Sequence, residues 1–577
     1  MDQRRMFLAI GISIAILIGF QLISARIVPP APPPETLAET SAQPAATAPA
    51  PVPPAEAAAA EAARAAPRLA IDAPSVTGSI SLLGARLDDL VLRDYRETTA
   101  ADSPRVRLLA RAGGAEPYAV QFGWSAAPGS SAKLPDNDTL WTASAATLTP
   151  QSPVTLSWNN GAGLTFEIVL GIDAHYMFSV ERRVRNDSGA AVTLSPWTRI
   201  RRDYTPTTAG YYILHEGLLG VLDGRLKELT YANAKSEGAK NAGLAFSTAT
   251  TGGWAGITDK YWLVALIPDQ KQAETASFRS VKLATGEGYQ VDFIPETATT
   301  IAPGADASSR ARVFAGAKEV HLLDRYEREY AIPHFDKAVD FGWFYFLTKP
   351  IFYALDWLYW MTGNFGVAIL IFTVFAKGLF FPLANKSYKS MSKMRLLGPK
   401  MQALRERFKD DPARQQQEMM ALYKAEGVNP ASGCLPMLIQ VPVFFSLYKV
   451  IFVTIEMRQA PFFGWIRDLS AQDPTNLFNL FGLIPFDPTV LSPFLHLGIW
   501  PLVMGVSMFL QQRLNPAPPD PVQARMFQFM PLIFTFMLAR FPAGLVIYWT
   551  WNNMLSIAQQ WLIMRNTRLG QPRMART

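Results

Sequence analysis

Residues 369–388 read ILIFTVFAKGLFFPLANKSY, an apolar run with one lysine, Lys377, inside it. The run approaches the length of about 20 apolar residues that one crossing of a bilayer requires. An ammonium group near the centre of such a span costs at least about 2.5–3.5 kcal/mol unless it reaches water or a polar partner. Two alternatives follow. Lys377 either extends to the membrane surface past a span that ends early at Pro382, or faces a hydrated recess inside a helical bundle.

The whole composition is that of a membrane protein. Apolar residues make up 49% of the 577 positions and charged residues 18%, a balance shifted away from soluble proteins. The single cysteine, Cys434, excludes an intramolecular disulfide. Apolar runs predict six transmembrane helices, at residues 6–23, 365–385, 433–454, 493–512, 526–541 and 543–564.

The N-terminal region predicts an anchor followed by a tether. Arg4 and Arg5 precede the apolar run 6–23, which is longer than the core of about 7–15 residues in a cleaved signal peptide. We therefore assign residues 1–28 as an uncleaved signal anchor in preference to a removed signal. Residues 29–68 form a Pro/Ala-rich linker, with 11 Pro and 16 Ala between positions 29 and 67, and we expect it to be extended.

Two further segments precede the main group of spans. Residues 69–335 contain short alternating runs separated by Gly, Pro, Asn and Asp, which predicts a large antiparallel β-sandwich. Residues 336–364 are rich in Trp, Tyr and Phe, and Pro350 is expected to break a straight span there. This favours an amphipathic helix lying on the bilayer surface over an additional transmembrane helix.

The positions of the basic residues predict the topology. Ten Lys or Arg lie between 386 and 430, and four lie in the tail from 565 onward. By the positive-inside rule, this loop and both termini are cytoplasmic, including the basic tail 566–577, and the β-domain lies across the membrane. Most of the excess positive charge behind the net charge of +7 therefore lies beside predicted spans, which favours lipid over DNA as the partner of these basic residues.

Several spans carry neutral polar residues that accompany Lys377. Thr373 lies four residues before Lys377 and shares its helical face, and Gln440 lies inside another span. In the last span three polar residues share one face: Asn552, Ser556 and Gln559. Because no span offers an acidic partner, a wet groove for polar or acidic peptide is favoured over a proton relay. Ordinary interhelical hydrogen bonding is the alternative for the Asn and Gln residues.

The loop 386–430 predicts a basic helical hairpin. An apolar stripe at spacings of three and four consists of Met394, Leu397, Met401, Leu404 and Phe408. A turn is expected at 410–412, and helical periodicity resumes over 415–426. The stripe either pairs the two helices with each other or docks hydrophobic client segments or ribosomal RNA, because Met side chains adapt to varied partners.

Long runs in the membrane part resemble the YidC/Oxa/Alb family of membrane protein insertases, in its Gram-negative form with a large periplasmic domain. The resemblance extends over about 340–565. It rests on KSYKSMSKMRLLGPKMQALRERF (386–408), QQQEMMALYKAEGVNPASGCLPMLIQVPVFFSLYKV (415–450), EMRQAPFFGWIRDLSAQDP (456–474) and FMPLIFTFMLARFPAGLVIYW (529–549). In the β-domain, HEGLLGVL (215–222) and WAGITDKYWLVALIP (254–268) are also similar.

The resemblance implies a bacterial inner-membrane insertase and chaperone with a periplasmic β-supersandwich and a five-span core at 365–565. That core surrounds a hydrophilic groove, and the clients are nascent membrane proteins, inserted alone or with the Sec translocon. The ribosome, through the basic hairpin and tail, and membrane lipids are the further partners. Lys377 falls where well-studied members have Arg, Thr373 and Gln440 fall on groove positions, and Trp549 falls where a substrate-contacting Tyr often stands. The resemblance assigns no role to the loop 477–492.

No enzymatic chemistry is expected. The sequence contains no GxxxxGK[ST] phosphate loop, and we predict no catalytic residue, cofactor or metal. Two rival functions remain open. One is a secondary transporter, which polar residues in spans would suit. The other is a sugar-processing enzyme in the β-domain, whose candidate acid–base residues are His175, His215, Glu216 and Asp259.

Overall fold

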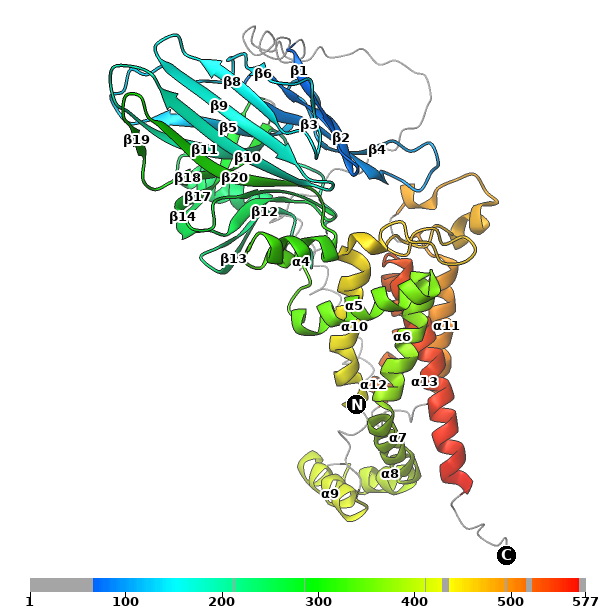
Figure 1. Cartoon of the computed structure of the whole chain (residues 1–577). Helices are drawn as coiled ribbons and strands as arrows, with labels where there is room; N and C mark the ends of the chain where they lie inside the picture. The colour runs from blue at the N-terminus through cyan, green and yellow to red at the C-terminus, as the bar shows by residue number, and fades with distance from the viewer. Residues whose placement is uncertain are drawn as a thin grey trace, which may run out of the picture.

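The computed structural model describes residues 66–569 apart from 211–212, 285, 410, 428–434, 493–494 and 515–520. The predicted signal anchor 1–28, nearly all of the linker 29–68 and most of the tail 566–577 lie outside the described residues. Figure 1 shows a β-domain at one end of the molecule, a group of helices below it and a small helical hairpin at the far end.

Two large sheets form the β-domain, which confirms the predicted β-rich architecture. In order, the first contains β14 (Leu244–Thr251), β17 (Ala273–Leu283), β18 (Gly286–Pro295), β11 (Val192–Arg202), β5 (Tyr118–Ala126), β3 (Arg86–Arg96), β2 (Val76–Ser81), β1 (Arg68–Asp72) and β7 (Thr147–Leu148), with β19 (Thr299–Ile301) on β11 and β4 (Arg105–Leu109) on β3. The second contains β13 (Arg225–Thr230), β12 (Gly217–Leu222), β15 (Trp254–Thr258), β16 (Trp262–Ile267), β20 (Asp306–Ala317), β10 (Met177–Asn186), β9 (Leu164–Ile172), β8 (Val154–Asn159) and β6 (Thr142–Ala143).

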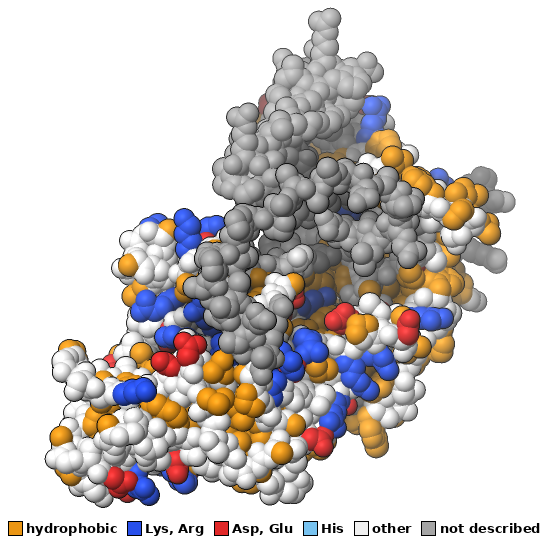
Figure 2. All heavy atoms as spheres, turned by 90° about the horizontal axis from the view of Figure 1, so that it is seen from above, with side chains coloured by type: hydrophobic (Ala, Val, Ile, Leu, Met, Phe, Trp, Pro, Cys, Tyr) orange, Lys and Arg blue, Asp and Glu red, His pale blue; other side chains and the backbone are white. Residues whose placement is uncertain are grey.

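The alternation of the sequence explains why the two sheets pack face to face. Along β9 and β11 every second residue is buried, so each strand presents one apolar face to the core and one face to solvent. Nearly all pairings are antiparallel, and β1 with β7 is parallel. Seen from the β-domain end, basic and acidic side chains are interspersed over the visible surface, as expected for a domain in water (Figure 2).

Within the β-domain, the helix α3 (Tyr231–Lys240) packs on the first sheet. The chain then passes from the β-domain to the helical part through α4 (Val320–Glu329), the 3₁₀ turn η1 (Phe335–Ala338) and α5 (Tyr345–Thr362). α5 runs across the long axis of α13 (Figure 1). Its buried face includes Ile351, Phe352 and Leu355, whereas Trp360 is 81% exposed, so the helix is amphipathic.

The expected break at Pro350 was wrong, because α5 continues through it. Proline in a helix removes one hydrogen bond and crowds the preceding turn. Here it is the sixth residue of α5, so one hydrogen bond is lost, and the buried neighbours Ile351 and Phe352 hold the helix by packing.

The remaining helices follow the predicted apolar runs. They are α6 (Phe365–Leu379), α7 (Phe381–Leu396), α8 (Gly398–Arg407), α9 (Pro412–Ala425), α10 (Leu435–Val453), α11 (Ile499–Leu514), α12 (Pro521–Leu538) and α13 (Ala543–Leu569), with 3₁₀ turns η3 (Ile455–Met457), η4 (Leu477–Gly482) and η5 (Pro488–Val490). Among the described residues, no single helix combines the length and the hydropathy expected of a membrane span. By length and composition alone, α6 and α7 together do, although a 62° bend separates them. Six spans therefore stay a prediction.

The bend corrects the expectation of one straight helix over 365–385. α6 ends at Leu379 and α7 begins at Phe381, with Pro382 as its second residue. Proline lacks the backbone N–H that would continue the hydrogen bonding of α6, and its ring crowds the carbonyl group four residues earlier, at Gly378, which accounts for the break. Lys377 therefore lies in the last turn of α6 and not near the middle of a continuous helix.

The hairpin also differs from the expectation of one helix over 394–408. The chain breaks at Leu397, before Gly398 and Pro399, so Met394 belongs to α7 and Met401 to α8. Proline at the start of α8 cannot continue the preceding helix, which explains the division. The turn expected at 410–412 lies slightly earlier, at 408–409. Residue 410 lies outside the described residues, and the Asp411 side chain caps α9, which begins at Pro412.

A buried carboxylate joins the β-domain to the helical part. Glu456, in the turn after α10, accepts a hydrogen bond of 2.9 Å from the backbone N–H of Val320, the first residue of α4. Burial raises the pKa of Glu456 to about 8. This side chain therefore fastens two regions that are far apart in the sequence while retaining its proton near neutral pH.

Replacing Glu456 with Gln is expected to remove a pH dependence of stability. Native Glu456 keeps its proton to about pH 8, whereas an unfolded glutamate releases it near 4.5, so the wild-type free energy of unfolding falls as pH rises between these values. Glutamine keeps an acceptor for Val320 without this loss. Unfolding of the full chain in detergent, at about pH 5 and pH 8, should show a variant whose advantage grows with pH. If the free energies of unfolding of wild type and Glu456→Gln change with pH in the same way, the raised pKa assigned to Glu456 is contradicted.

Candidate functional site

The ammonium of Lys377 points into the helical bundle. Its Nζ donates a hydrogen bond of 2.8 Å to the hydroxyl of Ser556 on α13. Ser556 is buried, and its own hydroxyl donates to the backbone oxygen of Asn552 at 2.7 Å. On the other side of α6, Phe375 is 67% exposed. This geometry favours the inward alternative for Lys377 over extension to the membrane surface.

Three helices contribute polar groups to the same region. Tyr548, Asn552 and Ser556 are spaced four residues apart on α13 and share one face. From α10, the Gln440 side chain lies beside the Tyr548 hydroxyl. We call Lys377, Gln440, Tyr548, Asn552 and Ser556 the polar seam. Tyr548 was missed in the sequence, although its position four residues before Asn552 was a usable signal.

Not every predicted groove residue belongs to this seam. Thr373 is buried on the face of α6 that carries Lys377, but its hydroxyl donates to the backbone oxygen of Ile369 in its own helix at 2.6 Å. Trp549 packs edge-on against Phe444, with ring centroids 4.7 Å apart, and against Phe534. Trp549 therefore contacts aromatic rings of α10 and α12, whereas Lys377 contacts Ser556, seven residues further along α13.

Another face of α13 fits ordinary helix–helix hydrogen bonding. The Asn553 amide donates to the Ser507 hydroxyl on α11 at 2.9 Å, and the Gln560 amide donates to the backbone oxygen of Leu514 at 3.0 Å. Such bonds satisfy polar side chains between helices. The interhelical alternative therefore describes Asn553 and Gln560 well, whereas Asn552 and Ser556 face α6.

The seam contains one cation and no matching acid. Within the described part of the chain, no carboxylate pairs with the Lys377 ammonium. The ammonium is partly buried and donates to the neutral hydroxyl of Ser556. An anionic group brought beside it would consequently meet an uncompensated positive charge. The arrangement can bind an acidic or polar segment but offers no chain of titratable groups.

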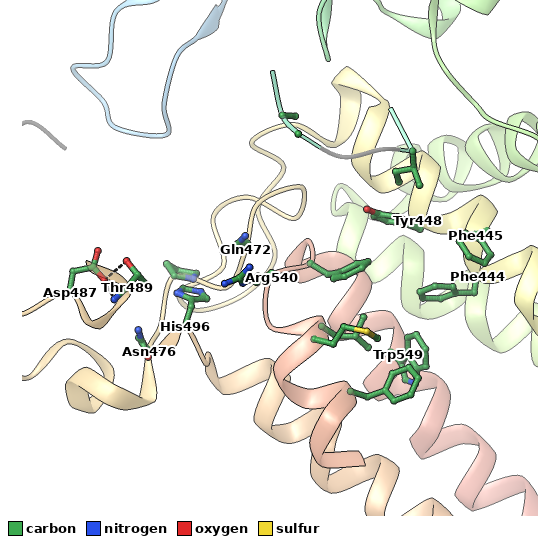
Figure 3. Close-up of a pocket in the computed structure, with 18 of the residues that line it drawn as sticks. Phe444, Phe445, Tyr448, Gln472, Asn476, Asp487, Thr489, His496, Arg540 and Trp549 are labelled. Atoms are coloured by element: carbon green, nitrogen blue, oxygen red, sulfur yellow. Dashed lines mark hydrogen bonds between the residues drawn. The ribbon is translucent and has the colours of Figure 1, made fainter. Parts of the chain in front are cut away.

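A cavity of about 1060 Å³ lies between α10, α12, α13 and the loop that follows α10. Figure 3 shows Phe444 and Trp549 at one end and Asp487, Thr489, Asn476 and His496 toward the other. Trp549 is the only predicted groove residue among those found to line it in the described structure.

Comparisons with known proteins agree along the chain. Residues 68–354 match the family model described as the YidC periplasmic domain, and residues 357–570 match the 60Kd inner membrane protein family. A membrane protein insertase YidC from Granulibacter bethesdensis is 63% identical over 578 residues, covering 100% of both chains. The chain belongs to the YidC membrane protein insertase family. A second YidC, from Acidiphilium cryptum, is 57% identical over 100% of this chain and 99% of its own.

The solved structures include an active YidC insertase with its first transmembrane domain resolved. It shares 18% sequence identity and a TM-score of 0.34, covering 86% of this chain and 92% of that chain. The sequence relatives carry the family assignment, and the YidC family is one of bacterial inner-membrane insertases. Membership of it favours insertion over the rival transporter and sugar-processing functions.

In this YidC family member the stripe of the hairpin is largely internal. Leu397 and Met401 are buried against Tyr423 of α9, with Met394 packed beside them, as ordinary helix pairing requires. Leu404 and Phe408 are partly buried, and Met420 is 56% exposed. A client that docks on this paired hairpin would contact the exposed Met420 and the basic side chains on the surface.

The acid–base residues considered in the YidC-type β-domain have structural partners. Asp259 pairs with Arg202 at 2.8 Å, and Glu216 accepts the backbone N–H groups of Ala209 and Lys260. The His215 ring contacts the backbone oxygen of Leu218 at 3.0 Å, and His175 lies elsewhere, in the turn after β9. These bonds give each residue other than His175 a role in holding loops together.

One group of potential metal ligands occurs among the described residues, namely Glu327 of α4 with His334 and Asp336 of the segment between α4 and α5. Asp336 already accepts hydrogen bonds from the Lys349 ammonium and the Tyr345 hydroxyl. A cation would therefore compete with an ammonium already in place, which disfavours a metal at this position.

Proposed function

We propose that this chain inserts membrane proteins by sheltering their hydrophilic segments at the polar seam while their apolar segments pass into lipid. The observation that carries the proposal is the contact of Lys377 with Ser556, which turns the ammonium toward the polar face of α13. Clients are nascent membrane proteins, inserted alone or together with the Sec translocon.

The seam lowers the barrier that a polar segment meets in lipid. Each unsatisfied backbone group in the hydrocarbon region costs several kcal/mol, so a hydrated recess lets a segment enter part of the way without losing its partners. An acidic residue in that segment is attracted to Lys377 more strongly than in bulk water, because the surrounding dielectric is lower. Release of the apolar part then gains about 0.8 kcal/mol for each buried CH₂. No nucleotide hydrolysis is required.

Lysine gives the seam a point charge. Arginine presents a planar fork that grips a carboxylate through two parallel hydrogen bonds, whereas the lysine ammonium rotates freely on a flexible stem. In this chain the ammonium already donates to Ser556, so a client carboxylate would share it with that hydroxyl. We infer that attraction by charge, and not bidentate geometry, is what the seam provides.

The proposed orientation places the β-domain in the periplasm and both termini in the cytoplasm. The basic hairpin and the β-domain lie at opposite ends of the helical part, which supports this orientation (Figure 1). The positive-inside rule then assigns the hairpin, rich in Lys and Arg, to the cytoplasm, where clients and the ribosome arrive.

Photocrosslinking tests the proposed seam directly. A photoreactive amino acid at position 440 or 552 is expected to capture a stalled nascent membrane protein, because both positions contribute to the seam. Position 553 is the matched control, since its side chain faces α11 and Ser507. Equal capture from 552 and 553, or capture from neither 440 nor 552, would refute the seam as the client path.

Deleting residues 395–426 is expected to leave the rest of the fold intact and to slow client capture. The apolar contacts of α8 and α9 are largely with each other, so their loss exposes little of the remaining core. Capture kinetics of a nascent chain by vesicles containing the protein provide the measurement. As a smaller change that tests the same docking role, Met420→Ser removes an exposed methionine. Its control is Met401→Leu, which alters a buried methionine. Unchanged capture after the deletion would rule out a docking role.

A further inference from the structure

The cavity beside Trp549 has two chemically different ends. Figure 3 shows Arg540 and Gln472 close to His496 at the polar side. The opposite side is aromatic and receives side chains from three helices, namely Phe444 of α10, Phe534 of α12 and Trp549 of α13. A ligand that fills the whole space must itself have a polar end and an apolar end.

The polar end suits a phosphate group. Arg540 lies in the turn between α12 and α13, and its guanidinium offers several N–H donors in a planar fork that matches phosphate oxygens. Gln472 adds an amide donor to the same wall. The His496 ring is held by a contact of 3.0 Å with the backbone oxygen of Asp473, which keeps it at this end of the cavity.

The aromatic end suits hydrocarbon chains. Trp549 packs edge-on against Phe444, with ring centroids 4.7 Å apart, and its ring is tilted against that of Phe534, with centroids 6.0 Å apart. At the rim, Phe445 of α10 is 40% exposed and Met537 of α12 is 48% exposed. The apolar lining therefore continues outward between these two helices, toward the side where lipid would lie in the proposed orientation.

We propose that this cavity binds one glycerophospholipid of the bilayer, with its phosphate at Arg540 and its acyl chains against Phe444, Phe534 and Trp549. A volume of about 1060 Å³ is at the upper end of the range for single small-molecule ligands. Ala209 and Ile213 of the β-domain and Asn476 of the loop also line the cavity, so it is covered on the β-domain side. A single amphipathic molecule fits this cover better than a polypeptide that runs straight through.

The lipid site goes beyond the proposed insertion function and lies beside the Tyr548 end of the seam, away from Lys377 and Ser556, because Trp549 follows Tyr548 on α13 and both rings contact Phe444. Trp549 and Ser556 are separated by about 10 Å of helix rise along α13. A bound lipid would brace α10 against α12 and α13 at the end where the β-domain sits. Loss of the lipid is therefore measurable without any insertion assay.

Native mass spectrometry of the full chain tests the proposal. The protein is released from nanodiscs of phosphatidylethanolamine and phosphatidylglycerol, and the retained phospholipids are counted. Wild type is expected to retain one, whereas Arg540→Gln and the cavity-filling Leu538→Trp should lower its occupancy by about tenfold. Arg467→Gln is the matched control, because Arg467 is an exposed arginine on the loop that follows α10 and is not among the residues that line the cavity; this variant should retain the lipid.

A second measurement uses the unaltered protein. A phospholipid with a photoreactive acyl chain is expected to label peptides within 444–448 and 534–549. Labelling elsewhere only, or equal lipid retention by wild type and Leu538→Trp, would overturn the proposal. Capture of a nascent chain from these same positions, with no lipid labelling there, would assign the cavity to polypeptide instead.

Discussion

Leucine in place of Lys377 is expected to slow the insertion of clients with acidic translocated segments by about tenfold or more. A charge pair at about 4 Å contributes between about 1 kcal/mol in water and about 4 kcal/mol near a protein surface, and tenfold in rate corresponds to about 1.4 kcal/mol. Leucine removes the charge and also leaves the buried Ser556 hydroxyl without the ammonium that donates to it. The measurement is the insertion rate into vesicles that contain the purified protein.

Two controls separate charge from packing. Lys377→Arg keeps the cation and should retain most of the rate. A client whose translocated segment is neutral should insert into vesicles carrying the Lys377→Leu variant at nearly the wild-type rate, because the attraction to an acidic group is the interaction removed. If this variant inserts acidic and neutral clients equally well, then Lys377 has no role in binding the client.

Methionine in place of Lys349 is expected to lower the free energy of unfolding by about 3–5 kcal/mol. Lys349 lies between the partly buried Asp324, to which it donates at 2.8 Å, and the buried Asp336, to which it also donates. The hydroxyls of Tyr353 and Tyr345 complete the same network. Removal of the ammonium leaves two carboxylates in a poorly hydrated place, which is the costly way to break a buried ion pair.

The pH dependence gives this prediction a second signature. Burial opposes the charged forms, but the hydrogen bonds within the network outweigh it, holding the pKa of Asp336 below its usual value and that of Lys349 above its usual value. The network therefore stabilises the fold above the ordinary aspartate pKa of 3.8 and below the ordinary lysine pKa of 10.5, and it weakens as pH falls through the lowered pKa of Asp336 or rises through the raised pKa of Lys349.

The control for this network is nearby. Lys337→Met changes a partly exposed lysine of η1 and should alter stability little. Adding Asp324→Asn and Asp336→Asn to the Lys349→Met variant should recover part of the loss, because the stranded charges are then gone. Denaturant unfolding of the full chain in detergent is the measurement. A loss below about 1 kcal/mol in Lys349→Met would contradict a structural role for the network.

The parts of the fold governed by periodicity were predictable from the sequence. Alternation along β9 and β11 indicated a half-buried sheet, and the apolar runs gave the approximate positions of α10 to α13. The breaks were harder, because proline has opposite outcomes in different contexts. Pro382 accompanies a 62° bend, whereas Pro350 lies inside a continuous helix whose buried face compensates for the lost bond.

The site was predictable only as a set of polar residues. Spacing along one helix indicated that Asn552 and Ser556 share a face, but which neighbouring helix that face meets depends on packing between segments remote in sequence. Tyr548 was overlooked beside Trp549 because a tyrosine near a helix end is usually an interfacial residue. The hairpin stripe was ambiguous for a similar reason, since the same periodicity serves internal pairing and partner binding.

Thiol accessibility tests most directly whether the Lys377 position is hydrated from inside the bundle. In a background with Cys434 replaced by serine, Lys377→Cys is treated with a charged, membrane-impermeant thiol reagent from the cytoplasmic side. Phe375→Cys, on the exposed opposite side of α6, is the comparison. Rapid modification of position 377 with little at 375 is the expected result. A position 377 that reacts no faster than 375 would contradict a water-filled recess.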